Sequence, residues 1–97
     1  MAWKVIFSAR SRTDLEQIVN YIARDNSAAA ERFGFRLIQQ AESLSDAPAI
    51  GPTLPQKPGT RFFPVGSYLI IYRPDETQRT VRILRFWHAA RRKRPTR

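Results

Sequence analysis

The sequence predicts an α+β protein in which one strand and a two-helix hairpin precede a three-stranded antiparallel meander, in the order β-α-α-β-β-β. Three observations predict this class. Apolar residues recur at the helical interval between residues 11 and 45, they alternate at 2–7 and again along 60–88, and a proline-rich connection separates these regions. The length of 97 residues suits one domain with one sheet and one layer of helices.

The N-terminal part is expected to form a strand and then a helix. In "AWKVIF" (residues 2–7) the apolar side chains at alternate positions share one face, which is typical of a strand. From Leu15 to Ile22 the apolar residues instead return every three or four positions, as on one side of a helix. Two capping boxes, starting at Ser11 and at Thr13, are candidate starts for this helix.

A second helix is expected from about residue 28 to residue 45, with residues 25–27 ending the first helix and capping the second. Such a short junction forces the two helices, of about 15 and 18 residues, to run antiparallel on one face of the sheet. Gly34 lies inside the second helix beside its apolar stripe, although a helical glycine costs about 1 kcal/mol relative to alanine. We therefore expect the helices to approach each other closely at Gly34.

The C-terminal half is expected to form the meander. The prolines and glycines between residues 48 and 59 indicate a long loop, in which Ile50 and Leu54 are possible anchors. The strands follow at 60–65, 67–74 and 79–88. Pro64 indicates that the first of these is an edge strand or ends at that residue.

The last two strands carry apolar residues on both faces. Strict alternation in 79–88 groups Leu84 and Phe86 with Arg82 and His88 on one face, and places Trp87 with Arg85 on the other. A sheet face exposed to water is normally polar, and one helical hairpin can cover only one face. The other face then needs a partner, a second copy of the chain, or the proline-rich loop folded back over it.

Charge and composition exclude several classes of protein. Residues 1–56 hold six basic and six acidic residues, whereas residues 57–97 hold eleven basic and two acidic ones, which is the whole net charge of +9. This asymmetry favours an acidic or polyanionic partner. With no cysteine and one histidine, neither a disulfide framework nor a metal site is expected, and nothing indicates a cofactor.

No apolar run approaches the roughly 20 residues that cross a bilayer, and the N-terminus lacks a signal-peptide layout, so a cytoplasmic protein without membrane contact is expected. We expect one domain over residues 1–90 and a basic tail over 91–97.

Three stretches together resemble the RelE/ParE toxin superfamily. "ARSRTDLEQIVNYIARDNSAAAERF" is similar to its helical hairpin, "FFPVGSYLIIYR" to its central strand pair, and "VRILRFWHAARR" to its closing strand. The similarity covers about residues 3–92 in the correct order. Each stretch is mainly a packing pattern, so the specificity comes from the three in combination.

The resemblance implies a toxin of a bacterial type II toxin–antitoxin pair, held in a hetero-oligomer by a small antitoxin whose acidic C-terminal segment wraps it. RelE-like members cut mRNA on the ribosome, and ParE-like members inhibit DNA gyrase and have no known hydrolytic centre. The long helices and the "FPVGSY" strand look more like ParE, so gyrase inhibition is favoured over mRNA cleavage. A third possibility is a small basic nucleic-acid-binding module.

RNA cleavage would need a general base, a general acid and cations on the phosphate. Histidine is the side chain that titrates near neutral pH, so the candidate set is Arg61, Arg85 and His88. The catalytic sets of RelE-like enzymes are not intact here, since the last tyrosine is Tyr72. The interpretation therefore leans away from an enzyme.

Two candidate binding sets follow. Guanidinium groups pair well with phosphate, and the candidate target-binding residues are Arg73, Arg82, His88, Arg91, Arg92 and Lys93. The candidate antitoxin-binding residues are Leu84, Phe86 and Trp87.

Overall fold

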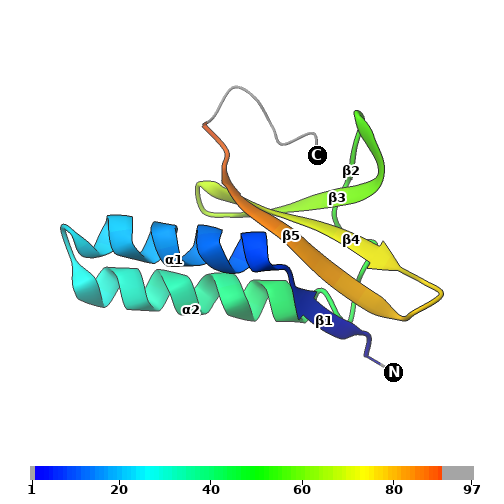
Figure 1. The fold of residues 1–97 in the computed structure, drawn as a ribbon, viewed down its shortest axis with the longest axis horizontal. Coiled ribbons are helices and arrows are strands. Elements are labelled where there is room, and N and C mark those ends of the chain that lie inside the picture. Colours follow the sequence, from blue (N-terminus) through cyan, green and yellow to red (C-terminus); the bar gives the residue numbers. More distant parts are fainter. Residues whose placement is uncertain (1, 91–97) are drawn as a thin grey trace.

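A computed structural model describes residues 2–90, which form a helical hairpin and a five-stranded sheet (Figure 1). The elements in chain order are β1 (Lys4–Phe7), α1 (Ala9–Ala23), α2 (Ser27–Ser43), β2 (Thr53–Leu54), β3 (Lys57–Val65), β4 (Tyr68–Asp75) and β5 (Thr80–His88). Both helices lie on one side of the sheet, as Figure 1 shows. The α+β class, the hairpin and the β3–β4–β5 meander are confirmed.

The sheet is mixed, which corrects the expectation of a lone N-terminal strand beside an antiparallel meander. The strand order is β1-β5-β4-β3-β2, and β1 runs parallel to β5, with Val5 opposite Val81 and Phe7 opposite Ile83. This pairing lets the apolar face of β1 join the same core as Ile83. The two-residue strand β2, inside the proline-rich connection, pairs with β3 and was not expected.

The N-cap residues of the two helices differ in how well they could be predicted. The side chain of Ser8 caps α1 by accepting from the backbone amide of Ser11 at 3.0 Å, so both predicted capping boxes are wrong. The reason is that the helix begins directly after β1, where the first available hydroxyl is that of Ser8. Asn26 caps α2 in the predicted junction by accepting from Ala29 N at 2.9 Å.

Gly34 lies at the closest contact of the two helices. A Cβ atom added there would stand 2.8 Å from Cγ2 of Val19 on α1. The expected close approach is confirmed, and it explains why the helix carries a residue of low helical propensity.

The main core lies between the helices and the sheet. Its fully buried members come from every layer and include Leu37, Ala41, Ile70, Tyr72, Val81, Ile83 and Phe86. A second, smaller cluster lies on the opposite face of the sheet, where Leu54, Leu69 and Ile71 are buried and Phe62, Leu84 and Trp87 pack against them.

A β-bulge in β5 overturns the predicted grouping of its side chains. Ile71 is opposite Arg85 but Tyr72 is opposite Ile83, so Leu84 is an extra residue with no partner on β4. Because one added residue inverts the alternation, Phe86 points to the helices together with Ile83, while Leu84 shares the other face with Trp87.

The proline-rich connection provides part of the cover that the second face needs. Leu54 of β2 packs on this face against Leu69 and Ile71 of β4. Leu54 is 1% exposed, and Leu69 and Ile71 are 5% and 2% exposed. The loop alternative is therefore correct for this part of the face, whereas Leu84 and Trp87 remain half-buried. Within residues 2–90, no helix is long and apolar enough to cross a membrane.

Candidate functional site

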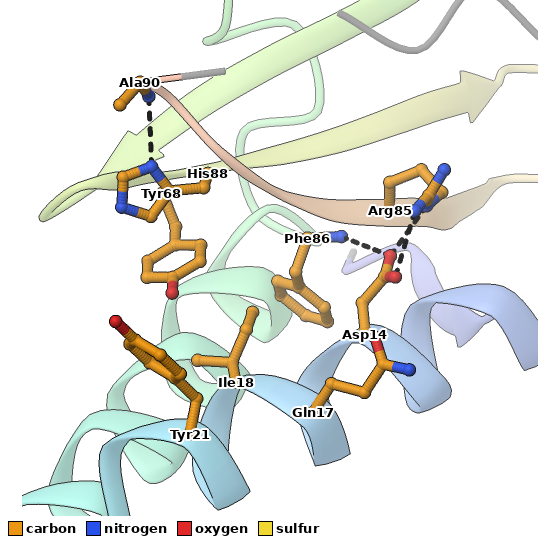
Figure 2. Close-up of a pocket in the computed structure, with 9 residues that line it drawn as sticks. All are labelled: Asp14, Gln17, Ile18, Tyr21, Tyr68, Arg85, Phe86, His88 and Ala90. Carbon is orange, nitrogen blue, oxygen red and sulfur yellow. Dashed lines mark hydrogen bonds and ion pairs between the residues drawn. The ribbon is translucent and has the colours of Figure 1, made fainter.

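A pocket of about 470 Å³ lies where the first helix meets the end of the last strand (Figure 2). It is lined by Asp14, Gln17, Ile18, Tyr21, Tyr68, Arg85, Phe86, His88 and Ala90. The four residues from α1 share one side of the helix because their spacing of three or four residues matches its turn. The strand residues reach the pocket because the bulge turns Phe86 and His88 towards the helices.

Asp14 ties the helix to the strand at one end of this pocket. Its carboxylate accepts from Arg85 Nε at 2.7 Å and from the second guanidinium nitrogen at 3.1 Å, which makes a two-point ion pair. The same carboxylate accepts from the backbone amide of Phe86 at 3.1 Å. The side chains of Asp14 and Arg85 are only 10% and 14% exposed, so this pair is screened far less by water than a surface pair.

The edge of β5 explains why Asp14 is needed there. β1 ends at Phe7, beside Ile83, so the outer edge of β5 has no neighbouring strand beyond that point. Ser8 Oγ donates to the carbonyl of Leu84 at 3.0 Å, and Asp14 accepts from the next outward amide, that of Phe86. Two side chains from the start of α1 thus replace a missing strand and hold the bulge in place.

His88 of β5 is paired directly opposite Tyr68 of β4. The two rings lie edge to face, with their centroids 4.8 Å apart. Its Nδ1 accepts from the backbone amide of Ala90 at 3.1 Å, so in the neutral ring the proton is on Nε2. Tyr68 also contacts Phe33 of α2 at 5.6 Å between centroids. Both rings are therefore held in position by their neighbours.

The opposite side of the pocket is formed by exposed residues of α1. Tyr21 is 66% exposed although it is a large aromatic side chain, and Gln17 is also exposed. The guanidinium of Arg24 lies 5.9 Å from the centre of the Tyr21 ring. Figure 2 shows the Tyr21 and Tyr68 side chains reaching towards the space between helix and strand from their two sides.

The structure brings two of the three predicted ribonuclease residues, Arg85 and His88, to one pocket and places Arg61 elsewhere. Arg61 is paired with Tyr72 of β4, whereas His88 is paired with Tyr68, four residues away on the same strand. Four residues of strand span about 13 Å. Its guanidinium donates to the loop carbonyls of Ala49 at 3.3 Å and Gly51 at 2.6 Å. Arg85 is engaged by Asp14.

The hydroxyl of Tyr72 secures the same loop by accepting from Gly51 N at 3.0 Å. Burial raises the pKa of Tyr72, and this effect outweighs the opposing influence of the Gly51 hydrogen bond and of Arg61. Arg61 and Tyr72 therefore act together to fasten the proline-rich connection to the sheet.

Two of the predicted target-binding arginines are neighbours. Arg73 and Arg82 face each other directly across β4 and β5, and both are exposed. Like charges directly opposite each other in a sheet repel. Arg73 is oriented by a 3.0 Å hydrogen bond to Thr60 Oγ1. Arg91, Arg92 and Lys93 lie outside the described residues.

The predicted antitoxin-binding set is divided between two faces. Leu84 and Trp87 lie together on the face away from the helices, and the Trp87 ring is stacked by the Arg85 guanidinium at 5.0 Å. Phe86 is 3% exposed in the main core, so its assignment to the same face as Leu84 is wrong. The bulge at Leu84 is the physical reason.

The α1 side of the pocket was not found by sequence reasoning. Asp14 entered the prediction only as the fourth residue of the capping box that starts at Ser11, and Tyr21 was not a candidate site residue. A signal was present, because Asp14, Gln17 and Tyr21 recur at the helical interval next to that stripe. It could not be separated from an ordinary solvated helix face without knowing what β5 places opposite.

Comparison with known proteins identifies the family. Residues 5–93 match the family described as "ParE toxin of type II toxin-antitoxin system, parDE". The chain belongs to this ParE toxin family. No curated protein matches it significantly.

Solved structures share the fold of this ParE family member. A chain of the chromosomal ParDE system from P. aeruginosa superimposes with a TM-score of 0.75 at 18% identity, covering 90% of this chain and 96% of that one. A chain of the RelBE2 toxin–antitoxin complex from Mycobacterium tuberculosis gives 0.72 at 27% identity, covering 94% and 95%. A double mutant of the E. coli toxin RelE in the free state gives 0.66 at 17% identity, covering 93% and 86%. The chain is thus a ParE/RelE-type toxin of a toxin–antitoxin system.

Proposed function

We propose that the protein inhibits DNA gyrase in the manner of a ParE toxin and is neutralised by a cognate antitoxin with an acidic segment. The observation that carries this proposal is the family match over residues 5–93. The contacts of the site residues support it, because Arg61 lies outside the pocket of His88 and the guanidinium of Arg85 is already paired with Asp14. An inhibitor needs a binding surface and not an acid–base pair.

The target-binding surface is proposed to use Arg73, Arg82 and His88, together with Arg91, Arg92 and Lys93. Arg73 and Arg82 support this because the strand register places these two exposed arginines directly opposite each other, and guanidinium groups pair well with the oxygens of a carboxylate or a phosphate. The antitoxin-binding surface is proposed to use Leu84 and Trp87, which lie on the sheet face away from the helices.

A second candidate function is RelE-like cleavage of mRNA on the ribosome. The RelBE2 chain at 27% identity and the free RelE structure favour it, since the same fold occurs in both branches. In this case His88, Arg85 and Arg61 would be the catalytic candidates, and Arg61 would have to leave the carbonyls of Ala49 and Gly51.

A gyrase supercoiling assay with purified protein tests the first proposal. Inhibition with accumulation of cleaved DNA, relieved by adding antitoxin, is the expected result. Unaffected supercoiling together with cleaved mRNA in a translation reaction would instead establish the second function.

A further inference from the structure

We propose that the pocket between α1 and β5 binds an unpaired nucleobase of a single-stranded nucleic acid. This proposal is independent of whether the toxin acts on gyrase or on the ribosome. It rests on the shape of the pocket, on its aromatic walls and on the distribution of charge within it.

The walls of the pocket suit a flat aromatic ligand. Tyr21 stands on the helix side, and the edge-to-face pair of Tyr68 and His88 stands on the strand side (Figure 2). Ile18 and Phe86, both buried, provide an apolar base between them. Unpaired bases are commonly bound by stacking on tyrosine or histidine rings in this way.

Tyr21 is the residue whose position is otherwise unexplained. Its ring is 66% exposed, so it contributes little to the core, yet it lines the pocket of about 470 Å³ beside the core. The Arg24 guanidinium at 5.9 Å from its centre adds positive charge beside the ring. A base stacked on Tyr21 would cover this exposed ring and bring its phosphate close to a cation.

Polar groups in the pocket match the edge of a base. Gln17 offers an amide donor and acceptor, Tyr21 offers a hydroxyl, and in its neutral form the His88 ring carries its proton on Nε2. Every nucleobase edge presents donors and acceptors that such groups can bind.

The charge within the pocket favours a neutral base over an acidic side chain. Arg85 is the only lysine or arginine among the nine lining residues, and it is already paired with Asp14. Among the lining residues within 2–90, a carboxylate entering the pocket would find no unengaged guanidinium. The phosphates of a nucleic acid would remain outside, where the chain's net charge of +9 attracts them.

Fluorescence anisotropy with the full chain tests this proposal. The probes are short labelled single strands of DNA and of RNA, each paired with a strand of the same length whose bases are replaced by abasic sites. We expect the base-containing strands to bind more tightly than the abasic strands, and Tyr21→Ala to weaken their binding by roughly ten-fold. Tyr21→Phe should retain most of the affinity because it keeps the ring.

Phe35→Ala is the matched control, because Phe35 is an aromatic residue of the other helix with a similar exposure of 62%. It should leave binding unchanged, and the abasic strands should not distinguish Tyr21→Ala from the unaltered chain. A preference for RNA or for DNA would identify the source of the base. Equal affinity for abasic and base-containing strands, or loss of antitoxin affinity alone in Tyr21→Ala, would overturn the proposal.

Discussion

The ion pair between Asp14 and Arg85 provides the sharpest test of how the site is built. Replacing Asp14 by asparagine removes the charge that neutralises Arg85, whose side chain is only 14% exposed, and disturbs the acceptor of the Phe86 amide. Breaking such a buried pair is costly because it leaves an uncompensated charge, and the slight exposure of both side chains places the loss at about 3 kcal/mol. That is a large share of the total stability of a domain of this size, which is about 5 to 15 kcal/mol.

Urea denaturation followed by tryptophan fluorescence measures this loss. We expect the midpoint to fall without a change in slope, because the folded and unfolded states keep their compactness. Glu16→Gln is the matched control, since Glu16 is an exposed acid on the same helix, and it should change the free energy of unfolding by less than about 0.5 kcal/mol. Combining Asp14→Asn with Arg85→Met should cost less than the sum of the two single changes. An Asp14 variant as stable as the Glu16 control would refute this reasoning.

Three further predictions follow from the packing. Gly34→Ala should lower the melting temperature in calorimetry, because its Cβ would stand 2.8 Å from Val19 Cγ2, and a rise would show that the helices can separate without cost. Tyr72→Phe should cost about 1 to 2 kcal/mol in urea denaturation by removing a buried acceptor. Burial raises the pKa of Tyr72 above 10.0 in the folded state. The stability that the neutral Tyr72 side chain contributes is therefore complete below pH 10.0, and it is lost as the pH rises through the higher pKa of the folded state. This alkaline loss should be absent from the phenylalanine variant. Leu84→Asp should weaken antitoxin binding in calorimetric titration while the protein remains folded, because Leu84 lies on the sheet face away from the helices. Phe86→Asp should instead unfold the protein, because Phe86 lies in the main core. An unchanged antitoxin affinity in the folded Leu84 variant would contradict the proposed surface.

The elements that depend on local patterns were predictable from the sequence. The helical hairpin follows from apolar periodicity and from the Asn26 cap, and the close contact at Gly34 follows from a glycine beside an apolar stripe. The β3–β4–β5 meander follows from alternation and turn residues. These features are determined by residues close together in the chain.

The features that depend on distant pairing were not predictable. The parallel alignment of β1 with β5 joins residues more than seventy positions apart, and alternation alone does not indicate which edge of the sheet receives β1. The bulge at Leu84 is likewise invisible in a continuous apolar strand, and it reverses the faces of Phe86 and Trp87. It is held by Ser8 and Asp14, whose contacts with β5 exist only after folding.

The candidate site was predicted only on its strand side. His88 was identified because it is the single histidine and lies where a strand ends before a basic run. Its surroundings on α1 were missed, because Gln17 and Tyr21 are indistinguishable in sequence from residues of a solvated helix face. Of the three covers considered for the second sheet face, the proline-rich loop provides part, because Leu54 folds back onto Leu69 and Ile71.

Gyrase-catalysed DNA supercoiling in the presence of the purified protein measures the proposed function most directly. Concentration-dependent inhibition that traps cleaved DNA and disappears on adding the antitoxin is the predicted result. Full supercoiling activity at every concentration of a folded, antitoxin-binding preparation would contradict the proposed gyrase target while leaving the fold and the family assignment intact.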